Sequence, residues 1–308
     1  LWSKLEEIKM NEPDDLYTLR NNFWLGNYQR AVAEGSSLSR LSDPLKIECK
    51  EFIFRSYIAM GQCNIVLDEV SDGPDTPIAL QAIKLLARYL SFSNDSEIIV
   101  GTLESWLSEA HAANSTTVQL VASTIYMHEG RIKDALRSIR HSTTMEQLAL
   151  NTQILIKMQR VDLAAKQVKL MQQADEDATL TQLATGWLHM ASGGNKYQEA
   201  AYVYEELIDK FGPTAMLLNG VAAANLHMGL FEEAERFLLQ AITQGPNDPD
   251  TLVNLIACYQ HMCKPQDLIQ RYTNQLKSSS PNHPYVKALA TVEGAFDRVA
   301  ASYASQIA

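Results

Sequence analysis

The stretch Thr214–Pro246 limits most strongly what this chain can fold into, because it holds two apolar patterns of helical period on either side of Gly229. Small or apolar side chains recur every three or four residues, a spacing that places them on one face of a helix. These positions are Leu217, Leu218, Val221, Ala222 and Asn225 before the glycine and Phe231, Ala234, Phe237, Leu238 and Ala241 after it. Gly229 can adopt the left-handed conformation that ends a helix, and Pro246 cannot continue one. The stretch therefore predicts a hairpin of two short helices.

The same turn signal recurs along the chain at a nearly constant interval. Its anchor is the residue that follows the turn by five positions: Ala31, Val66, Ala135, Ala164, Ala200, Ala234 and Leu268. Successive anchors are 35, 69, 29, 36, 34 and 34 residues apart, and the interval of 69 predicts a degenerate unit near Gly101. A period of about 34 residues with Gly, aromatic and Ala in this order is typical of tetratricopeptide repeats. Because such a hairpin buries its apolar face only against its neighbours, we expect an all-α fold, a right-handed α-solenoid of about eight tandem hairpins.

The pattern predicts one array over residues 11–308, with a C-terminal capping helix from about residue 284. Residues 1–10 precede the first repeat, and Met10 resembles a natural start, so we expect a leader foreign to the protein and assign it no function. Within the array we predict a return helix over 28–41, a surface loop over 71–77, a helix over 78–90 and a helix after Asp95. The last predicted helix runs from Pro284 to about Ala304.

Composition excludes several classes of partner. The net charge is −10, from 26 basic and 36 acidic residues, and Lys and Arg form no block. Nucleic acids and anionic membranes draw much of their binding from clustered basic residues, so neither is expected as a partner. Because no run approaches the ~18 apolar residues of a membrane span, we expect a cytosolic protein.

Sequence motifs give no indication of catalysis, a metal or a cofactor. The four cysteines, Cys49, Cys63, Cys258 and Cys263, lack zinc-site spacing and are expected to be buried thiols in a reducing compartment. Near the C-terminal ends of first helices lie His128, His189, His227 and His261. Since stacked first helices are roughly 10 Å apart, these imidazoles are expected at the surface rather than on a shared metal.

The first helix of each hairpin lines the inner, concave surface of such an array, and the repeat register nominates the residues that would bind a partner there. They are Leu16, Arg20, Phe23, Glu51, Arg55, Ile58, Leu120, Thr124, Met127, Gln153, Ile156, Thr185, His189, Met216, Asn219, Ala223, Leu226, His227, Val253, Ala257 and Gln260. The only basic residues, Arg20 and Arg55, are expected far apart, so a clamp for a chain-terminal carboxylate is not expected. An extended or hairpin-shaped element of a partner is favoured instead.

Three segments carry a family resemblance: FWLGNYQRAV near the start, LLNGVAAANLHMGLFEEAE with DPDTLVNL behind it, and NHPYVKALATVEGAFDRVAASYA at the end. From about Asn11 onward the chain closely resembles the epsilon subunit of coatomer. The resemblance implies a non-catalytic tetratricopeptide array without cofactors that binds the C-terminal domain of the alpha subunit around an extended hairpin. It also implies a cytoplasmic coat subunit, peripheral on Golgi membranes and on vesicles that return to the endoplasmic reticulum.

Two alternatives stay open from the residues. A tetratricopeptide adaptor or co-chaperone for peptide segments would need basic and Asn residues clustered on the inner surface. An enzyme or regulatory subunit would need a pair of carboxyl groups with strongly shifted pKa values in a deep pocket.

Overall fold

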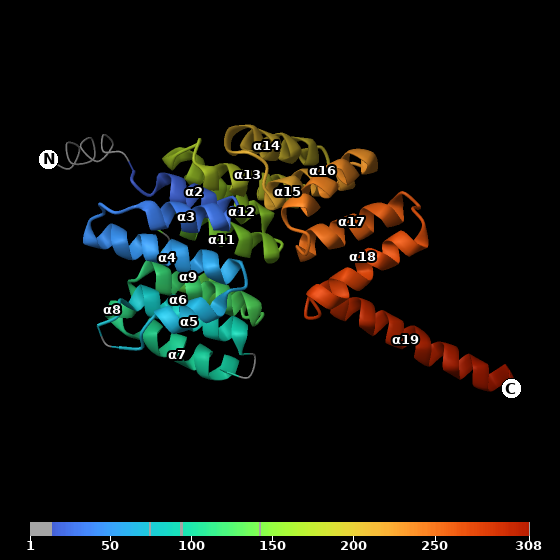
Figure 1. The fold of residues 1–308 in the computed structure, drawn as a ribbon, viewed down its shortest axis with the longest axis horizontal. Coiled ribbons are helices and arrows are strands. Elements are labelled where there is room, and N and C mark those ends of the chain that lie inside the picture. Colours follow the sequence, from blue (N-terminus) through green and yellow to red (C-terminus); the bar gives the residue numbers. More distant parts are fainter. Residues whose placement is uncertain (1–13, 74, 93–94, 142, 308) are drawn as a thin grey trace. The chain divides into compact units, whose positions relative to one another are not determined.

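The computed structural model describes residues 14–73, 75–92, 95–141 and 143–307, and Figure 1 shows their fold. These residues form helices joined by turns and short loops, without a strand among them. The all-α fold predicted from the repeat is therefore confirmed. The predicted leader, residues 1–10, lies outside the described residues.

The contacts divide the chain into two compact units, which are described separately: an N-terminal unit, residues 1–191, and a C-terminal unit, residues 192–308. The helices of the N-terminal unit are α2 (Tyr17–Trp24), α3 (Tyr28–Ser37), α4 (Asp43–Ala59), α5 (Cys63–Glu69), α6 (Ile78–Ser91), α7 (Ser96–Ser108), α8 (Ala110–Ala113), α9 (Thr116–His128), α10 (Ile132–Ser138), α11 (Met145–Lys157), α12 (Val161–Ala174) and α13 (Thr179–Ser192), which ends at the boundary. Those of the C-terminal unit are α14 (Lys196–Phe211), α15 (Ala215–His227), α16 (Phe231–Gln244), α17 (Pro249–His261), α18 (Gln266–Ser279) and α19 (Pro284–Ile307).

Consecutive helices pack as hairpins in both units, among them α2 with α3, α9 with α10, α11 with α12, α15 with α16 and α17 with α18. The predicted degenerate unit is α6 with α7, and α7 also packs against α8 and α9. The predicted helices at 78–90 and after Asp95 correspond to α6 and α7. The predicted helix 28–41 is too long, because α3 ends at Ser37 and Leu38 is extended. There the Ser36 and Ser37 hydroxyls bond backward to the Val32 and Glu34 carbonyls.

The anchor residues form the buried contact between successive hairpins. Six of them, all but Leu268, are 0% exposed. In the last repeat this position is taken by Ile269, which is buried, while Leu268 is half-buried. The register shifts because α16 begins two residues after Gly229, whereas α18 begins three residues after Cys263.

The turns between paired helices use a left-handed residue. Gly229 has φ 76° and needs no Cβ there. Gln159 and Cys263 hold the same conformation with φ 60° and 52°, and each ends the first helix of a hairpin. A side chain in this region costs roughly 1–2 kcal/mol, so these two turns carry strain that Gly229 avoids.

The last helix, α19, begins at Pro284 as predicted and extends to Ile307. Tyr285 and Val286 in its first turn pack against the apolar core formed by α16, α17 and α18, and Lys277 pairs with Glu293 at 3.2 Å. Capping of the final hairpin is thus performed by the first turn, whereas large apolar side chains further along α19 are exposed.

Candidate partner-binding site

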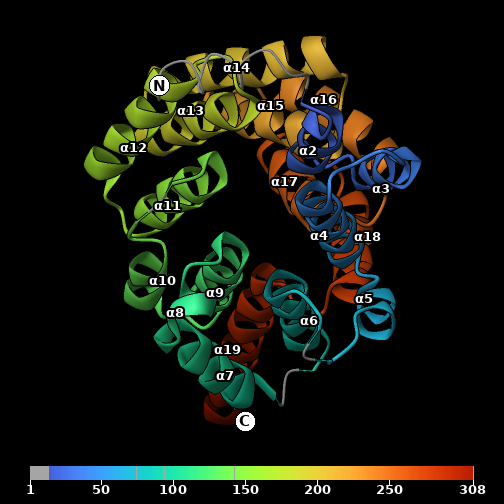
Figure 2. The same ribbon diagram turned by 90° about the vertical axis from the view of Figure 1, so that its left-hand side faces the viewer.

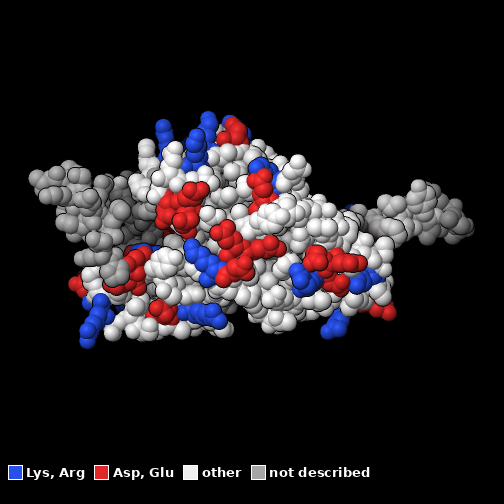
Figure 3. Space-filling view, turned by 90° about the horizontal axis from the view of Figure 1, so that it is seen from above, with Lys and Arg blue, Asp and Glu red and all other residues white. Residues whose placement is uncertain are grey.

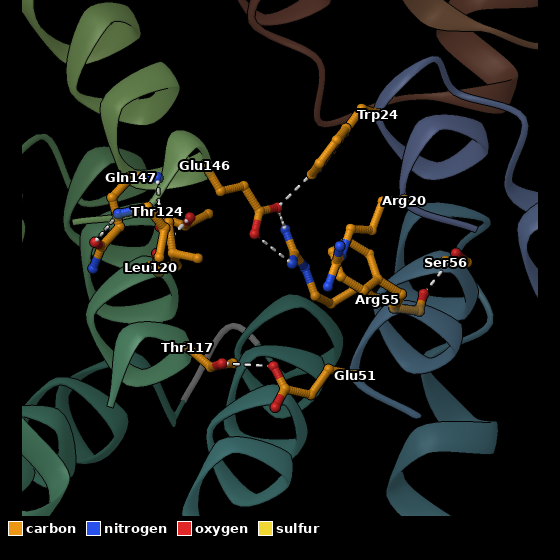
Figure 4. A network of polar contacts seen from close by, with 12 residues as sticks. Arg20, Trp24, Glu51, Arg55, Ser56, Thr117, Leu120, Thr124, Glu146 and Gln147 are labelled. Carbon is orange, nitrogen blue, oxygen red and sulfur yellow. Dashed lines mark hydrogen bonds and ion pairs between the residues drawn. The ribbon is translucent and has the colours of Figure 1, made fainter. Parts of the chain in front are cut away.

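A cavity of about 420 Å³ lies among the first helices of the N-terminal unit. In Figure 2, α4, α6, α9 and α11 surround a common centre, and Figure 4 shows the polar side chains that point into it. The lining residues are Arg20, Trp24, Glu48, Glu51, Phe52, Arg55, Thr116, Thr117, Leu120, Thr144, Met145 and Glu146. Four predicted inner-face residues are therefore brought together: Arg20, Glu51, Arg55 and Leu120.

An ion pair between Arg55 of α4 and Glu146 of α11 crosses this cavity (Figure 4). The pair is bidentate: Nη1 of Arg55 donates to Oε2 of Glu146 at 3.1 Å, and Nη2 donates to Oε1. Both side chains are about one-fifth exposed. Burial lowers the pKa of Arg55, but the charge and hydrogen bonds of Glu146 outweigh it, so the pKa is raised overall. The guanidinium therefore stays charged and fixes α4 to α11.

Aromatic rings hold the Arg55 guanidinium in place. Its central carbon lies 4.5 Å from the centroid of the Phe23 ring and 5.1 Å from that of Phe52, within range of cation–π attraction. The Trp24 indole donates to Oε1 of Glu146 at 3.2 Å. Residues from α2, α4 and α11 thus converge on one carboxylate.

Local helix capping explains where Glu146 lies. The Thr144 hydroxyl accepts the Gln147 N–H at the start of α11, and the Gln147 side-chain oxygen accepts the Thr144 N–H, which together form a capping box. Glu146 lies in the first turn, where the helix dipole favours a negative charge. The Gln147 amide also donates to Oε1 of Gln119 on α9, which ties the start of α11 to its neighbour.

Glu51 on α4 makes a second contact across the first helices. The Thr117 hydroxyl on α9 donates to Oε2 of Glu51 at 2.6 Å. Burial raises the pKa of Glu51, although this hydrogen bond and the nearby Arg55 lower it in part. Since Glu146 is paired with Arg55 and Glu51 is bonded to Thr117, these carboxyl groups are structural ties rather than an acid–base pair.

Arg20 and Arg55 were expected far apart, and this expectation is wrong because α2 packs against α4. Arg20 is also neutralised: its Nε donates to Glu48 at 2.9 Å and its Nη1 to Asp14 at 2.7 Å. Both cations of the cavity are therefore already occupied by carboxylates.

The other nominated residues of the N-terminal unit lie in three environments. Leu16 and Ile58 are buried in the core, 0% and 9% exposed, so they are corrected from the inner surface to packing positions. Both belong to apolar clusters, Leu16 with Leu19 and Ala31, and Ile58 with Val66 and Ile83. Gln153 is exposed. Half-buried are Phe23, Thr124, Met127, Ile156, Thr185 and His189.

In the C-terminal unit the nominated residues lie on α15 and α17. Met216, His227 and Gln260 are exposed, and the half-buried ones are Asn219, Ala223, Leu226, Val253 and Ala257. Asn219 links the two helices: its amide donates to Asp248 at 3.2 Å, and its oxygen accepts from Asn254 at 3.0 Å. This polar ladder fixes the spacing of two successive first helices.

The histidines end or nearly end their first helices, as predicted. Two of them stack on rings of the preceding second helix. His227 lies 4.6 Å from the Tyr197 ring centroid at 6°, and His261 lies 4.9 Å from that of Phe231 at 5°. They are therefore exposed side chains with a packing role between repeats. Within the described part of the chain, His, Cys, Asp and Glu side chains nowhere gather in threes around a possible metal position.

The expectation of buried thiols holds for Cys49 and Cys258. Cys63 is half-buried and Cys263 is exposed, which corrects the prediction for these two. Cys263 is exposed because it occupies a left-handed turn position rather than a helix face.

The repeat register does not nominate Trp24, Thr117 or Glu146, which also line the cavity. Glu146 lies 91 residues from Arg55 and 122 from Trp24. A repeat register relates each helix to its neighbours, so it cannot identify a contact between helices several repeats apart. The capping box at Thr144 was readable in the sequence, and it would have placed Glu146 in a helix's first turn.

The distribution of charged side chains on the surface agrees with the absence of a Lys and Arg block in the sequence. On the face shown in Figure 3, basic side chains lie next to acidic ones in small groups, without a broad basic field. None of the described helices combines the length and hydropathy that a membrane crossing requires.

Comparison with known proteins identifies the family. The model of the coatomer epsilon subunit family matches residues 12–304. The chain is 44% identical over 295 residues to coatomer subunit epsilon-1 of Arabidopsis thaliana, covering 96% of this chain and 99% of that one. It is 37% identical to coatomer subunit epsilon of Dictyostelium discoideum, with 92% and 97% covered. For the epsilon subunit from Caenorhabditis elegans the identity is 35%, with 93% and 98% covered.

Solved structures support the fold. A tetratricopeptide repeat protein from Parabacteroides merdae superposes with a TM-score of 0.59 at 15% identity, covering 85% of this chain and 96% of that chain. A chain of the APC/C hetero-tetramer Cut9-Hcn1 gives a TM-score of 0.62 at 13% identity, with 93% and 56% covered. At these identities the likeness concerns the helical-repeat fold alone. The family match over residues 12–304 and the relatives that are 35–44% identical show that the chain belongs to the coatomer epsilon subunit family and is a structural, non-catalytic subunit of a protein coat.

Proposed function

We propose that this coat subunit binds the C-terminal domain of the coatomer alpha subunit through the inner face of its first helices. In this way it would serve Golgi-to-ER retrograde transport. The single observation that carries the proposal is the cavity of the N-terminal unit, into which side chains from four first helices, α2, α4, α9 and α11, converge. Its lining mixes aromatic, aliphatic and paired charged groups, a surface suited to an extended polypeptide segment.

The pairing of both inner-face arginines supports this assignment over a peptide adaptor. An adaptor that captures a chain-terminal carboxylate needs unpaired cations on the inner face, and Arg20 and Arg55 are both held by carboxylates. The proposed partner element is therefore internal to its chain, an extended or hairpin-shaped segment. We further propose a cytoplasmic location, peripheral on Golgi membranes and transport vesicles, reached through the coat rather than through a lipid-binding surface of this chain.

Co-purification with the C-terminal domain of the alpha subunit tests the proposal. Leu120→Glu with Leu226→Glu places two charges on half-buried inner-face positions, one in each unit. We expect the complex to be lost, because each carboxylate would be desolvated against the partner. Leu170→Glu with Leu239→Glu is the matched control, since these leucines are 50% and 41% exposed on the second helices α12 and α16.

Circular dichroism establishes that both double variants remain helical. The proposal is refuted if the inner-face variant stays folded and still co-purifies with the domain, or if the second-helix control loses the complex equally.

A further inference from the structure

The last helix carries an exposed apolar stripe with the spacing of a helix-pairing seam. The stripe consists of Leu289, Val292, Phe296, Val299 and Tyr303, separated by three, four, three and four residues. Val292, Phe296, Val299 and Tyr303 are 66%, 71%, 54% and 62% exposed. Alternation of three and four is the heptad pattern with which two helices pack side by side. Large apolar side chains exposed together in this way mark an interaction surface.

Repeat register places this α19 stripe on the inner-face side of the helix. The first helices α15, α17 and α19 begin at Ala215, Pro249 and Pro284, 34 and 35 residues apart. A shift of 35 residues brings the inner-face residue Ala257 of α17 onto Val292, and Asn254 onto Leu289.

The start of α19 supports this register. Asp248 caps α17 by accepting the Thr251 N–H at 2.9 Å, and His283, 35 residues after Asp248, accepts the Tyr285 N–H through Nδ1 at 3.2 Å. At equivalent positions, both helices therefore begin with a side chain that accepts a backbone N–H of the first turn.

The opposite side of α19 does not continue the core. The buried positions Leu252 and Ile256 of α17 correspond to Lys287 and Thr291, and the buried Leu255 and Tyr259 correspond to Ala290 and Gly294. This side of α19 therefore offers a following helix small and polar side chains, whereas the large exposed apolar ones lie on the inner-face side.

The charge of α19 argues against a lipid surface as the occupant. Lys287 and Arg298 are balanced by Glu293 and Asp297, whereas membrane-surface helices carry an excess of basic residues.

A second copy of this chain is also disfavoured. The stripe is about two heptads long, so two copies that pair through it alone would share only a short seam. Among the flanking positions, Ala295, Ala300 and Ser302 carry no charge that could fix register between identical helices, and Glu293 is paired with Lys277 of the same chain. The small side chains of the first three instead allow another helix to approach closely.

We propose that the α19 stripe binds an amphipathic helix of the same partner chain that occupies the inner face of the C-terminal unit. This inference rests on the proposed function. The stripe continues the row of inner-face positions on α15 and α17, so the chain that binds those positions is also the one expected to cover the stripe. The partner helix lies along α19 and buries Val292, Phe296, Val299 and Tyr303.

Titration calorimetry with the C-terminal domain of the alpha subunit tests the stripe in the full chain. Phe296→Asp with Val299→Asp places charges in the stripe, and we expect binding at least ~10-fold weaker. Ala301→Asp is the matched control, because Ala301 is exposed on the other side of α19. It should bind like the wild type.

The outcomes separate the two proposals. Unchanged affinity of the Phe296→Asp/Val299→Asp variant, together with loss of binding by Leu120→Glu/Leu226→Glu, overturns the inference on α19 and leaves the proposed function standing. Failure of the wild type to bind the domain overturns both.

A photoreactive residue at Val292 identifies what covers the stripe. Cross-links to partner residues spaced by three or four support a helix. Cross-links at a spacing of two, to a second copy of this chain, or to lipid in added anionic vesicles contradict the proposal.

Discussion

The two units of this protein are built from the same hairpin, yet they are held together differently. In the N-terminal unit, hydrogen bonds join residues 66, 91 and 122 positions apart, through Thr117–Glu51, Arg55–Glu146 and Trp24–Glu146. In the C-terminal unit, the inter-helix bonds of Asn219 reach Thr251 and Asn254, 32 and 35 positions away. The first unit is therefore closed by contacts between distant repeats, while the inter-helix bonds of Asn219 in the second join neighbouring repeats.

Contacts between distant repeats and contacts between neighbouring repeats should affect unfolding in different ways. Nearest-neighbour contacts sum along an array and allow it to open from an end. A tie such as Arg55–Glu146 couples helices that are not neighbours, so the N-terminal unit should open more cooperatively than the C-terminal unit. The C-terminal unit differs, because its last helix, α19, is held by the packing of its first turn and by the Lys277–Glu293 pair and leaves its apolar stripe exposed.

Breaking the cross-cavity ion pair should give the largest effect. Arg55→Met keeps the contact with Phe23 and Phe52 but leaves Glu146 partly buried without its cation. We expect the free energy of unfolding of the N-terminal unit to fall by roughly 2 kcal/mol, less than the 3–5 kcal/mol of a fully buried pair because solvent reaches both side chains. Denaturant titration measures the loss, and hydrogen exchange should locate it in α4 and α11.

Two variants control this prediction. Arg55→Met combined with Glu146→Met should recover most of the loss, since no unpaired charge remains. Arg160→Met, which removes an exposed pair with Asp162, should leave stability nearly unchanged. An Arg55→Met loss no greater than that of Arg160→Met would remove the distinction between the units.

Steric crowding gives the matching test in the C-terminal unit. A Cβ added at Gly220 would lie 2.9 Å from the Tyr204 ring, which is buried between α14 and α15. Gly220→Ala should therefore destabilise this unit by about 1 kcal/mol, the lower end of the usual cost of overpacking, with the loss of protection confined to α14–α18. Gly101→Ala in α7 meets no atom within 4 Å and should be neutral or slightly stabilising. Equal effects of the two substitutions would exclude close packing as the cause.

Relief of backbone strain in a turn should stabilise both units by a similar amount, because the strain is confined to one residue. Gln159→Gly in the N-terminal unit and Cys263→Gly in the C-terminal unit each remove a side chain from a left-handed position. We expect each to raise the free energy of unfolding by about 0.5–1 kcal/mol, the relief of strain less the added entropy of the unfolded chain. Thermal melts measure both, and a loss of stability at either site would contradict the strain.

The smallest expected effect is a pH dependence confined to the N-terminal unit. Because burial raises the pKa of Glu51, its ionised form costs stability at pH values above that folded-state pKa. Folded protein takes up the proton first as pH falls through the raised pKa, and the cost then disappears. Glu51→Gln, which keeps an acceptor for Thr117, should melt slightly higher than the wild type at pH 7. The difference in melting temperature should vanish as the pH falls through the pKa of Glu51. If it stays constant instead, titration of Glu51 is not its cause.

Periodicity predicted the fold well because the buried anchors repeat. Ala31, Ala135 and Ala234 occupy equivalent positions, and one register places them all at helix contacts. The same register misplaced Leu16 and Ile58, since burial depends on how a neighbouring hairpin covers the end of a helix. It could not find Glu146, whose partners lie several repeats away. It also treated α19 as a cap, since spacing alone does not reveal that a stripe of apolar side chains lacks a cover.

Hydrogen exchange of the free chain and of its complex with the C-terminal domain of the alpha subunit tests the central claim most directly. We predict new protection in the first helices α4, α9, α11, α15 and α17 and in α19, with the second helices α3, α10, α12 and α16 unchanged. Protection gained mainly on the second helices, with the first helices unchanged, would contradict binding through the inner face.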